Sequence, residues 1–222
     1  MQGRTVLFSE MTPDIDWEDR FNKWNDRHLV PSRLAAPGFT SAQRYKHADR
    51  ETYLAVYEAE DDSALTSEEF LAVEDYPNTE TKWMMANITD YSSYYGDQIA
   101  DLRGANLSGD PLDAPILYSV FFSVPDERED DFNAWYDKEH VPMLLKCDDW
   151  LMCRRFLIKD GEPQPWTHLA LHYLNDMSAF ESPEREAARS TKMFTKLLEE
   201  QWFQGSTTVY LRHGDRFVSP TK

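Results

Sequence analysis

The chain has 222 residues, of which 41% are hydrophobic and 14% aromatic, so it can bury a core and is not disordered. Its 40 Asp and Glu outnumber 23 Lys and Arg, and the net charge of −17 disfavours nucleic acid and anionic membranes as partners. No apolar run approaches the roughly 20 residues that cross a bilayer, and no signal-peptide apolar region opens the chain. We therefore expect a soluble, cytoplasmic protein that binds neither nucleic acid nor membranes.

The first half of the chain predicts a mixture of strands and amphipathic helices. Aromatic residues at helical spacing, Trp17, Phe21 and Trp24, indicate one buried helix face. The predicted elements are, in order, a strand at 5–11, a helix ending at Pro31, strands near 39–46 and 52–60, a helix opening with a capping box of Thr66 and Glu69, and a strand near 97–103 that ends at Gly104.

The second half predicts the same sequence of elements. They are a strand at 116–124, a helix ending at Pro142, strands near 150–158 and 166–174, a helix with Ser182 as N-cap and Pro183 at its first position, and a strand near 206–213 that ends at Gly214. The order β-α-β-β-α-β in each half is the ferredoxin-like arrangement.

An internal repeat relates the two halves. Residues 21–31 align without gaps with 132–142 at an offset of 111, and six of the eleven positions are identical. The repeat predicts two tandem copies of one ferredoxin-like module, 1–104 and 116–222, joined by a linker at 105–115. A sheet with both helices on one face leaves its other face uncovered. We therefore expect an α+β fold whose two antiparallel sheets pack as a barrel within the chain.

The residues at 135–142, Trp-Tyr-Asp-Lys-Glu-His-Val-Pro, resemble a motif of the dimeric α+β barrel superfamily. Its EthD-like branch ends its first helix with a similar Trp-x-x-x-Glu-His-x-Pro pattern, and the resemblance extends through Trp150 and Arg155. It covers both copies and implies the barrel fold. It implies function poorly, because the superfamily includes monooxygenases, cyclases, isomerases, lyases and haem enzymes.

His140 is the first candidate for catalysis. A histidine with a pKa of about 6.5 can act as acid or base near neutrality. At the expected C-terminal end of its helix the dipole would favour the charged form, and the alternative role is that of a helix cap. Asp137 could orient the imidazole or bond the turn near the proline, and Tyr136 is a further hydrogen-bond donor on this face. Copy one has Leu29 in place of His140 and His28 one step earlier, so we expect unequal pockets, with copy two the active one.

Further candidates for substrate binding lie on the predicted strands. His168 and His172 alternate on a strand face that we expect to look into the barrel, and copy one places Tyr53 and Tyr57 on the matching face. The two histidines are roughly 13 Å apart along the strand, too far to share one metal ion. Arg155 could bind a carboxylate or carbonyl of the substrate, or pair with an acidic residue. Trp135 is either a core residue or part of a pocket wall.

Motifs of other chemistries are absent from the sequence. It contains no Gly-x-Gly-x-x-Gly, no P-loop and no Gly-x-Ser-x-Gly, and its two cysteines lack zinc-site spacing. The sequence therefore predicts a lyase, isomerase or cyclase without metal or cofactor, in which His140 moves a proton beside the carbonyl of an apolar or aromatic substrate. The alternatives are a non-catalytic binding protein and a haem-binding or monooxygenase-type barrel. We favour a homodimer over a monomer.

Overall fold

The computed structural model describes residues 2–75 and 77–220. Its strands form a closed antiparallel barrel with the hydrogen-bonded order β1-β3-β2-β8-β5-β7-β6-β4. The predicted fold class, an α+β barrel of the ferredoxin-like type, is confirmed. None of the helices in the described ranges is long and apolar enough to cross a membrane.

The chain divides into two compact units. Unit one contains Met1–Asp97, Lys159–Pro163 and His213–Lys222, and unit two contains Gln98–Ile158 and Gln164–Arg212. The predicted boundaries would have placed 159–163 and 213–222 in copy two. The difference arises because three strands, β4, β6 and β8, are longer than predicted and each contributes residues to both units.

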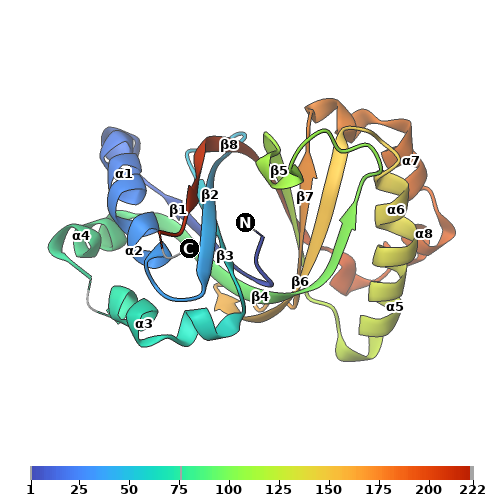
Figure 1. The fold of residues 1–222 in the computed structure, drawn as a ribbon. Helices are drawn as coiled ribbons and strands as arrows, with labels where there is room; N and C mark the ends of the chain where they lie inside the picture. Colours follow the sequence, from blue (N-terminus) through green and yellow to red (C-terminus); the bar gives the residue numbers. More distant parts are fainter. Residues whose placement is uncertain (1, 76, 221–222) are drawn as a thin grey trace. The chain divides into compact units, whose positions relative to one another are not determined.

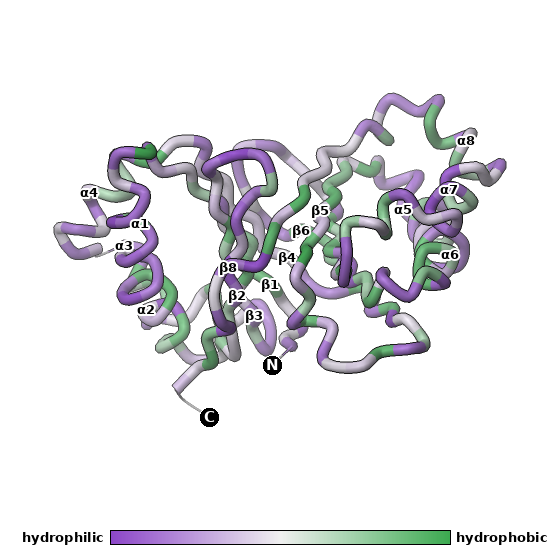
Figure 2. Tube along the Cα trace, turned by 90° about the horizontal axis from the view of Figure 1, so that it is seen from above, coloured by the Kyte–Doolittle hydropathy of each residue, from purple (hydrophilic) through white to green (hydrophobic). Residues whose placement is uncertain are grey.

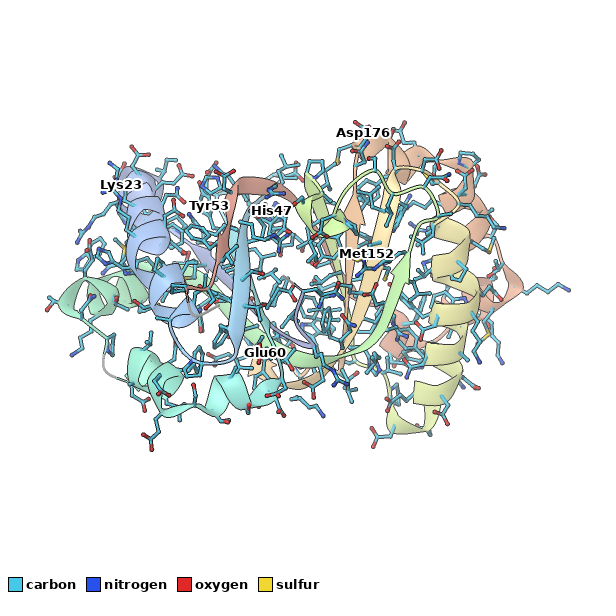
Figure 3. The ribbon with its side chains drawn as sticks, in the orientation of Figure 1. Lys23, His47, Tyr53, Glu60, Met152 and Asp176 are labelled. Atoms are coloured by element: carbon cyan, nitrogen blue, oxygen red, sulfur yellow. The ribbon has the colours of Figure 1, made fainter. Side chains whose placement is uncertain are left out.

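Unit one contains a sheet covered by helices on one face (Figure 1). Strand β3 pairs with β1 and β2 along its length, and β1 also pairs with β4. Tyr53 of β3, labelled in Figure 3, donates from its hydroxyl to Glu18 of the first helix at 2.5 Å. The elements are β1 Thr5–Thr12, α1 Glu18–Trp24, α2 Val30–Leu34, β2 Phe39–His47, β3 Tyr53–Ala59, α3 Glu68–Asp75, α4 Thr79–Asn87 and β4 Thr89–Arg103.

Unit two follows the same order. Strand β7 pairs with β5 and β6, and β5 also pairs with β8. In Figure 2 the strands β5 and β6 carry hydrophobic stretches, as expected for strands that are buried by helices. The elements are β5 Ile116–Phe122, α5 Glu129–Trp135, α6 Val141–Leu144, β6 Trp150–Glu162, β7 His168–Leu174, α7 Pro183–Arg189, α8 Lys192–Leu197 and β8 Ser206–Val218.

The first helix of each unit continues through its proline, contrary to the prediction. A π-helical segment, Asn25–Leu29 in unit one and Tyr136–His140 in unit two, joins the two α-helical parts. The backbone N–H of Val141 bonds to the carbonyl of Tyr136, five residues back. Pro142 follows at the start of α6, where its missing N–H and fixed φ are tolerated. His140 therefore lies inside a continuous helix, not at its end.

The second helices also differ in detail from the prediction. Each is two short helices, α3 with α4 and α7 with α8. Ser182 caps α7 as predicted, since its side chain accepts from the N–H of Arg185. The cap before α3 is Ser67, whose hydroxyl accepts from the N–H of Phe70, and not Thr66. Gly214 does not end β8 but lies within it, at a φ of +71°. A glycine tolerates this left-handed conformation without ending the strand.

One hydrogen-bonded triplet ties helix to sheet in each unit. In unit two the Arg155 guanidinium on β6 donates to Asp137 at 2.7 Å and to Asn133 at 2.6 Å. In unit one Arg44 donates in the same way to Asp26 and Asn22. Both guanidinium groups are buried. A buried charge with partners for its N–H groups is stable, but the loss of the charge leaves those partners unpaired.

We predict that Arg44→Gln and Arg155→Gln each lower the free energy of unfolding by about 2–4 kcal/mol, because each removes the charged side of a buried ion pair. Arg20→Gln is the matched control, since Arg20 pairs with Glu80 at the surface and such pairs contribute about 1 kcal/mol or less. Urea unfolding at pH 7 measures all three. Equal small losses would show that the triplets do not hold the helices.

Candidate functional site

The face of β7 that carries His168 and His172 packs against the helices of unit two. The Nε2 of His172 lies 2.9 Å from the Tyr136 hydroxyl, and the ring of His168 lies 5.4 Å from that of Phe132. This corrects the expectation that these side chains look into the barrel. The face belongs to the helix side because its central residue, Ala170, lies in one core cluster with Phe132 and Trp135 of α5 and Phe194 of α8.

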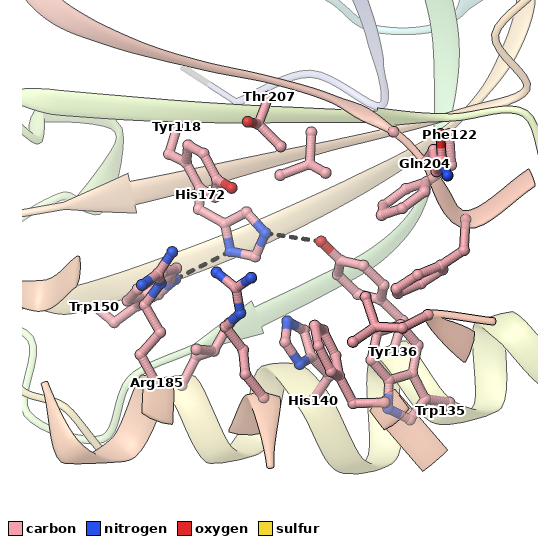
Figure 4. Close-up of a pocket in the computed structure, with 17 residues that line it drawn as sticks. Tyr118, Phe122, Trp135, Tyr136, His140, Trp150, His172, Arg185, Gln204 and Thr207 are labelled. Atoms are coloured by element: carbon pink, nitrogen blue, oxygen red, sulfur yellow. Dashed lines mark hydrogen bonds between the residues drawn. The ribbon is translucent and has the colours of Figure 1, made fainter. Parts of the chain in front are cut away.

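A cavity of about 360 Å³ lies between the sheet and the helices of unit two. Its size is at the lower end of the range found for ligand pockets, about 300–1,000 Å³. Figure 4 shows the strands on one side, with Tyr118 and His172, and the helix with Tyr136 and His140 on the other. The wall is mainly aromatic, and a few polar groups converge on it. It is lined by Tyr118, Val120, Phe122, Trp135, Tyr136, His140, Leu144, Trp150, His172, Arg185, Arg189, Phe194, Leu198, Phe203, Gln204, Gly205 and Thr207.

A chain of hydrogen bonds runs through His172 at the edge of this cavity. The indole N–H of Trp150 donates to Nδ1 of His172 at 3.0 Å. Burial and the nearby His140 and Arg155 lower the pKa of His172 to about 3, so its ring is neutral. An indole nitrogen can only donate, so Nδ1 accepts and the single proton of the ring is on Nε2.

The orientation of His172 decides what the Tyr136 hydroxyl can do. The Nε2–H of His172 donates to the Tyr136 oxygen, which leaves the phenolic proton for another acceptor. Burial raises the pKa of Tyr136 well above its usual value, so the hydroxyl stays protonated. Tyr136 lines the cavity, and it is therefore a neutral hydrogen-bond donor for a bound ligand.

His140 is the second polar group of the cavity wall on the helix. Burial lowers its pKa to about 4, with a hydrogen bond to the Ala188 backbone acting in the opposite direction and Arg189 and Arg185 lowering it further. The helix dipole does not leave it charged, contrary to the expectation from sequence. Its Nδ1 is buried and has no hydrogen-bond partner in the described part of the chain. A neutral His140 is therefore able to accept a proton.

Three sequence candidates of unit two, Asp137, Arg155 and His168, lie outside the cavity wall. The Asp137 carboxylate bonds to Arg155 and not to His140, so the pair holds the helix and does not tune the imidazole. The Arg155 guanidinium stacks on the Tyr136 ring at 4.5 Å and supports it from behind. His168 bonds through Nδ1 to the Thr167 hydroxyl at 2.9 Å and belongs to the core.

In unit one a buried arginine occupies the region that matches the cavity. Arg33, at the position of the cavity residue Leu144, is buried over the ring of Tyr57 at 5.2 Å and bonds to Glu74. Tyr57 and Tyr53 therefore pack in the core and do not line the cavity of unit two. Leu29 is buried where His140 stands, and His28 is exposed. The two units therefore differ in this region, and the cavity with polar groups belongs to unit two.

Several residues of the cavity wall are not among the site residues predicted from the sequence. Trp150 was noted only as part of the resemblance, although it sets the tautomer of His172. Tyr118 lies within the strand predicted at 116–124, and Phe194 follows the helix start predicted at Pro183. Arg185 and Arg189 were not considered. Their spacing of four on one helix was the available signal, since it places two positive charges on one face.

The three buried histidines of unit two differ in whether a ring nitrogen is available to haem iron or a metal ion. Both ring nitrogens of His172 are hydrogen bonded, and an axial ligand needs a nitrogen that faces the iron. Nδ1 of His140 and Nε2 of His168 are buried without a hydrogen-bond partner within residues 2–75 and 77–220, and the rings of Trp135, Tyr136 and Phe194 lie 4.8–5.9 Å from the ring of His140. Among the described residues no group of three or more His, Cys, Asp or Glu could hold a metal ion.

No family model and no curated protein matches the chain. Solved structures do. An anthrone oxidase-like protein has a TM-score of 0.71 at 13% identity and covers 98% of this chain and 94% of its own. A monooxygenase-like protein from Fusobacterium nucleatum has a TM-score of 0.60 at 11% identity, over 98% and 96% of the chains. A mutant chlorite dismutase from Candidatus Nitrospira defluvii has a TM-score of 0.62 at 11% identity, over 96% and 93%.

These neighbours are ferredoxin-like α+β barrels. This chain shares their fold. At such identities the likeness concerns the arrangement of strands and helices, and the chemistry has to be argued from the cavity residues.

His168 should make the protein sensitive to acid. Burial lowers its pKa to about 4 in the folded state, whereas an unfolded histidine titrates near 6.5. Between these values the unfolded state binds more protons, so stability falls as pH falls from 6.5 towards 4. Unit one has a tyrosine, Tyr53, at this position. We predict that, from pH 7 to pH 4.5, the free energy of unfolding of His168→Tyr rises by about 2 kcal/mol relative to that of wild type. Urea unfolding at both pH values measures this, and a difference independent of pH would contradict it.

Trp150→Phe tests the hydrogen-bond chain. Without the indole N–H we expect His172 to populate both neutral tautomers, because the indole is the donor that requires Nδ1 to accept, whereas Tyr136 and Cys153 at Nε2 can each donate or accept. Nitrogen-15 NMR of histidine-labelled protein at pH 7 distinguishes a protonated from an unprotonated nitrogen. Trp166→Phe is the control, since Trp166 contacts Phe121 and does not line the cavity. An unchanged spectrum in Trp150→Phe would show that another group fixes the tautomer.

Proposed function

We propose that unit two is a cofactor-independent enzyme that moves a proton at a carbon conjugated with a carbonyl group of a small, partly aromatic molecule. The observation that carries this proposal is that one cavity wall holds both a hydrogen-bond donor and a proton acceptor. Tyr136 offers a proton that His172 does not take, and the neutral His140 one turn along the helix has a buried nitrogen without a partner.

The reaction follows from these two groups. The carbonyl oxygen of the substrate accepts a hydrogen bond from the Tyr136 hydroxyl, and the Nδ1 lone pair of His140 takes the proton of the adjacent carbon. The electron pair of the C–H bond moves onto the oxygen, where Tyr136 stabilises the charge. His140 then returns the proton to a different carbon, which completes an isomerisation, or to a leaving group, which completes an elimination. His172 and Trp150 are positioning residues, since they act through Tyr136.

The aromatic wall suits such a substrate. Trp135, Phe194 and Phe203 pack against one another at the cavity with ring centroids 5.5–6.1 Å apart. Flat aromatic ligands gain contact area and favourable ring geometry on walls of this kind. The low polarity around the reacting atoms strengthens the hydrogen bond from Tyr136.

A second candidate is cofactor-free oxidation. Its support is the similarity to the anthrone oxidase-like protein, together with the fact that both reactions begin with the same deprotonation. An aromatic carbanion or phenolate can react with O₂ directly, so that anthrone plus O₂ gives anthraquinone plus water. A non-catalytic binding protein is a third candidate and predicts no turnover.

We also propose that the chain arose by tandem duplication and belongs near the EthD-like branch. The common order of elements and the recurrence of the Asn–Asp–Arg triplet in both units support the duplication. The Trp-x-x-x-Glu-His-x-Pro pattern supports the branch.

Anthrone is a suitable first probe, because its acidic carbon is conjugated with a carbonyl. Under anaerobic conditions in D₂O we expect the protein to accelerate deuterium incorporation at that carbon, as measured by NMR. His140→Ala and Tyr136→Phe should each slow the reaction about 100-fold or more, in keeping with a lost base or oxyanion donor. His28→Ala removes an exposed histidine of unit one and should leave the rate unchanged. Equal losses from His28→Ala and His140→Ala would exclude a special role of His140.

The same assay has a pH dependence and an aerobic arm. Because the pKa of His140 is lowered to about 4, its basic form persists above that value, and kcat/KM should be level from pH 5 to 8 and decline below pH 4.5. A decline that begins near pH 6.5 would contradict this environment of His140. In air, formation of anthraquinone beyond the uncatalysed rate would favour oxidation, whereas exchange alone would favour isomerase or lyase chemistry.

A further inference from the structure

Two arginines from α7 line the cavity of unit two without an acidic partner. Arg185 and Arg189 are four residues apart on the helix, and both contribute to the cavity wall. Neither forms an ion pair with any carboxylate in the described part of the chain. The two arginines also line a second pocket together with Glu181 and Glu186, but among the described residues neither glutamate forms an ion pair with them. In a chain with 40 acidic and 23 basic residues this is unusual.

The two guanidinium groups are held in place by neutral partners. Arg185 donates from Nη1 to the carbonyl of Phe180 at 2.8 Å and lies over the Phe180 ring at 5.4 Å. Arg189 lies over the ring of Phe194 at 5.5 Å. Aromatic faces attract cations but do not neutralise them. These contacts orient the two groups, and no carboxylate of the described residues neutralises them.

Two positive charges lie close together here, one half-buried on Arg185 and one exposed on Arg189. Like charges four residues apart on a helix repel each other. Burial and the neighbouring Arg189 lower the pKa of Arg185, and both arginines lower that of His140. An anion between the two groups would remove the repulsion and gain charge-assisted hydrogen bonds.

We propose that the substrate of this cavity carries a carboxylate, which Arg185 and Arg189 bind while its aromatic part packs on the cavity wall. The inference rests on the proposed function for the site and adds a substrate class, the aromatic or partly apolar keto acids. A carboxylate fits better than a larger anion because the cavity of about 360 Å³ also has to hold the carbon skeleton. A planar guanidinium matches the two oxygens of a carboxylate.

Binding of the carboxylate also adjusts the base. Besides burial, the charges of Arg189 and Arg185 hold the pKa of His140 down. The Ala188 backbone bonds to this ring and raises the pKa, while Tyr136 and His172, which also interact with it, are both neutral. Neutralisation of the arginines therefore makes His140 a stronger base only when a substrate with the correct charge is bound.

The test compares 2-naphthoate with 2-naphthamide, which have nearly the same size and shape but differ in charge. Isothermal titration calorimetry of wild-type protein at pH 7 and low salt should show naphthoate binding at least tenfold more tightly. In Arg185→Gln/Arg189→Gln this preference should fall to threefold or less. The matched control is Lys192→Gln/Lys196→Gln, which removes two positive charges four residues apart on α8, outside the cavity wall, and should keep the preference.

Arg189→Gln alone is the second variant, because Arg189 is exposed and its loss leaves the Arg185 hydrogen bond to Phe180 in place. In this variant the logarithm of the ratio of the two dissociation constants, naphthamide over naphthoate, should fall to half of its wild-type value or less. Equal binding of the two probes by wild type, binding of neither at millimolar concentration, or an equal loss in the lysine control would each overturn the inference. Tyr136→Phe should keep the preference for naphthoate, so a failed deuterium-exchange assay and a failed charge preference are separate results.

Discussion

The bond between the Arg155 guanidinium and the first helix of unit two is the interaction on which the site depends. The arginine extends from β6, donates to Asn133 and Asp137, and stacks against the ring of Tyr136. A charged, planar group with partners on two successive turns fixes both the height and the rotation of the helix against the sheet. Tyr136 consequently meets His172 at hydrogen-bond distance, and His140 comes to lie against the aromatic rings of the cavity.

The two units share the contacts that hold the first helix on the sheet but differ in the residues packed between helix and sheet. The triplet of Asn, Asp and Arg is the same in both, so helix and sheet are fastened alike. On the same helix, unit one has Asn25, Leu29 and Arg33 at the positions where unit two has Tyr136, His140 and Leu144. Unit one has the buried Arg33, paired with Glu74, at this place, whereas unit two has a cavity with a proton donor, a proton acceptor and two arginines around it that pair with no carboxylate of the described residues.

Much of the fold could be predicted from the sequence, because local residue patterns determine the order of strands and helices. The gapless match of 21–31 with 132–142 and the apolar spacing of the helices gave the order of elements. Tyr136, His140, Trp135 and His172 were named as candidates and lie in one cavity. The side of the sheet on which His172 lies was predicted wrongly. A period of two shows which residues share a strand face, but it cannot distinguish between two apolar faces.

The protonation states and ion pairs of the site residues were harder to predict from the sequence than the identity of those residues. The low pKa of His140 arises from burial under α7 and α8, which only the packing of distant segments determines. The Arg155–Asp137 bond joins residues on different elements, so the sequence left a functional and a structural role for both.

The π-helical turn at 136–140 constrains how this protein can change. It contains one residue more than an α-helix would need between the fixed points Asn133 and Val141. Removal of that residue would restore an ordinary helix and leave Asn133 and Val141 in place, so the change would fall on the spacing of Tyr136 and His140 within the turn. Unit one carries the same turn at 25–29, with Asn25 and Leu29 at the matching positions. The extra residue therefore constrains the cavity in unit two, whereas in unit one it constrains only the packing of the core.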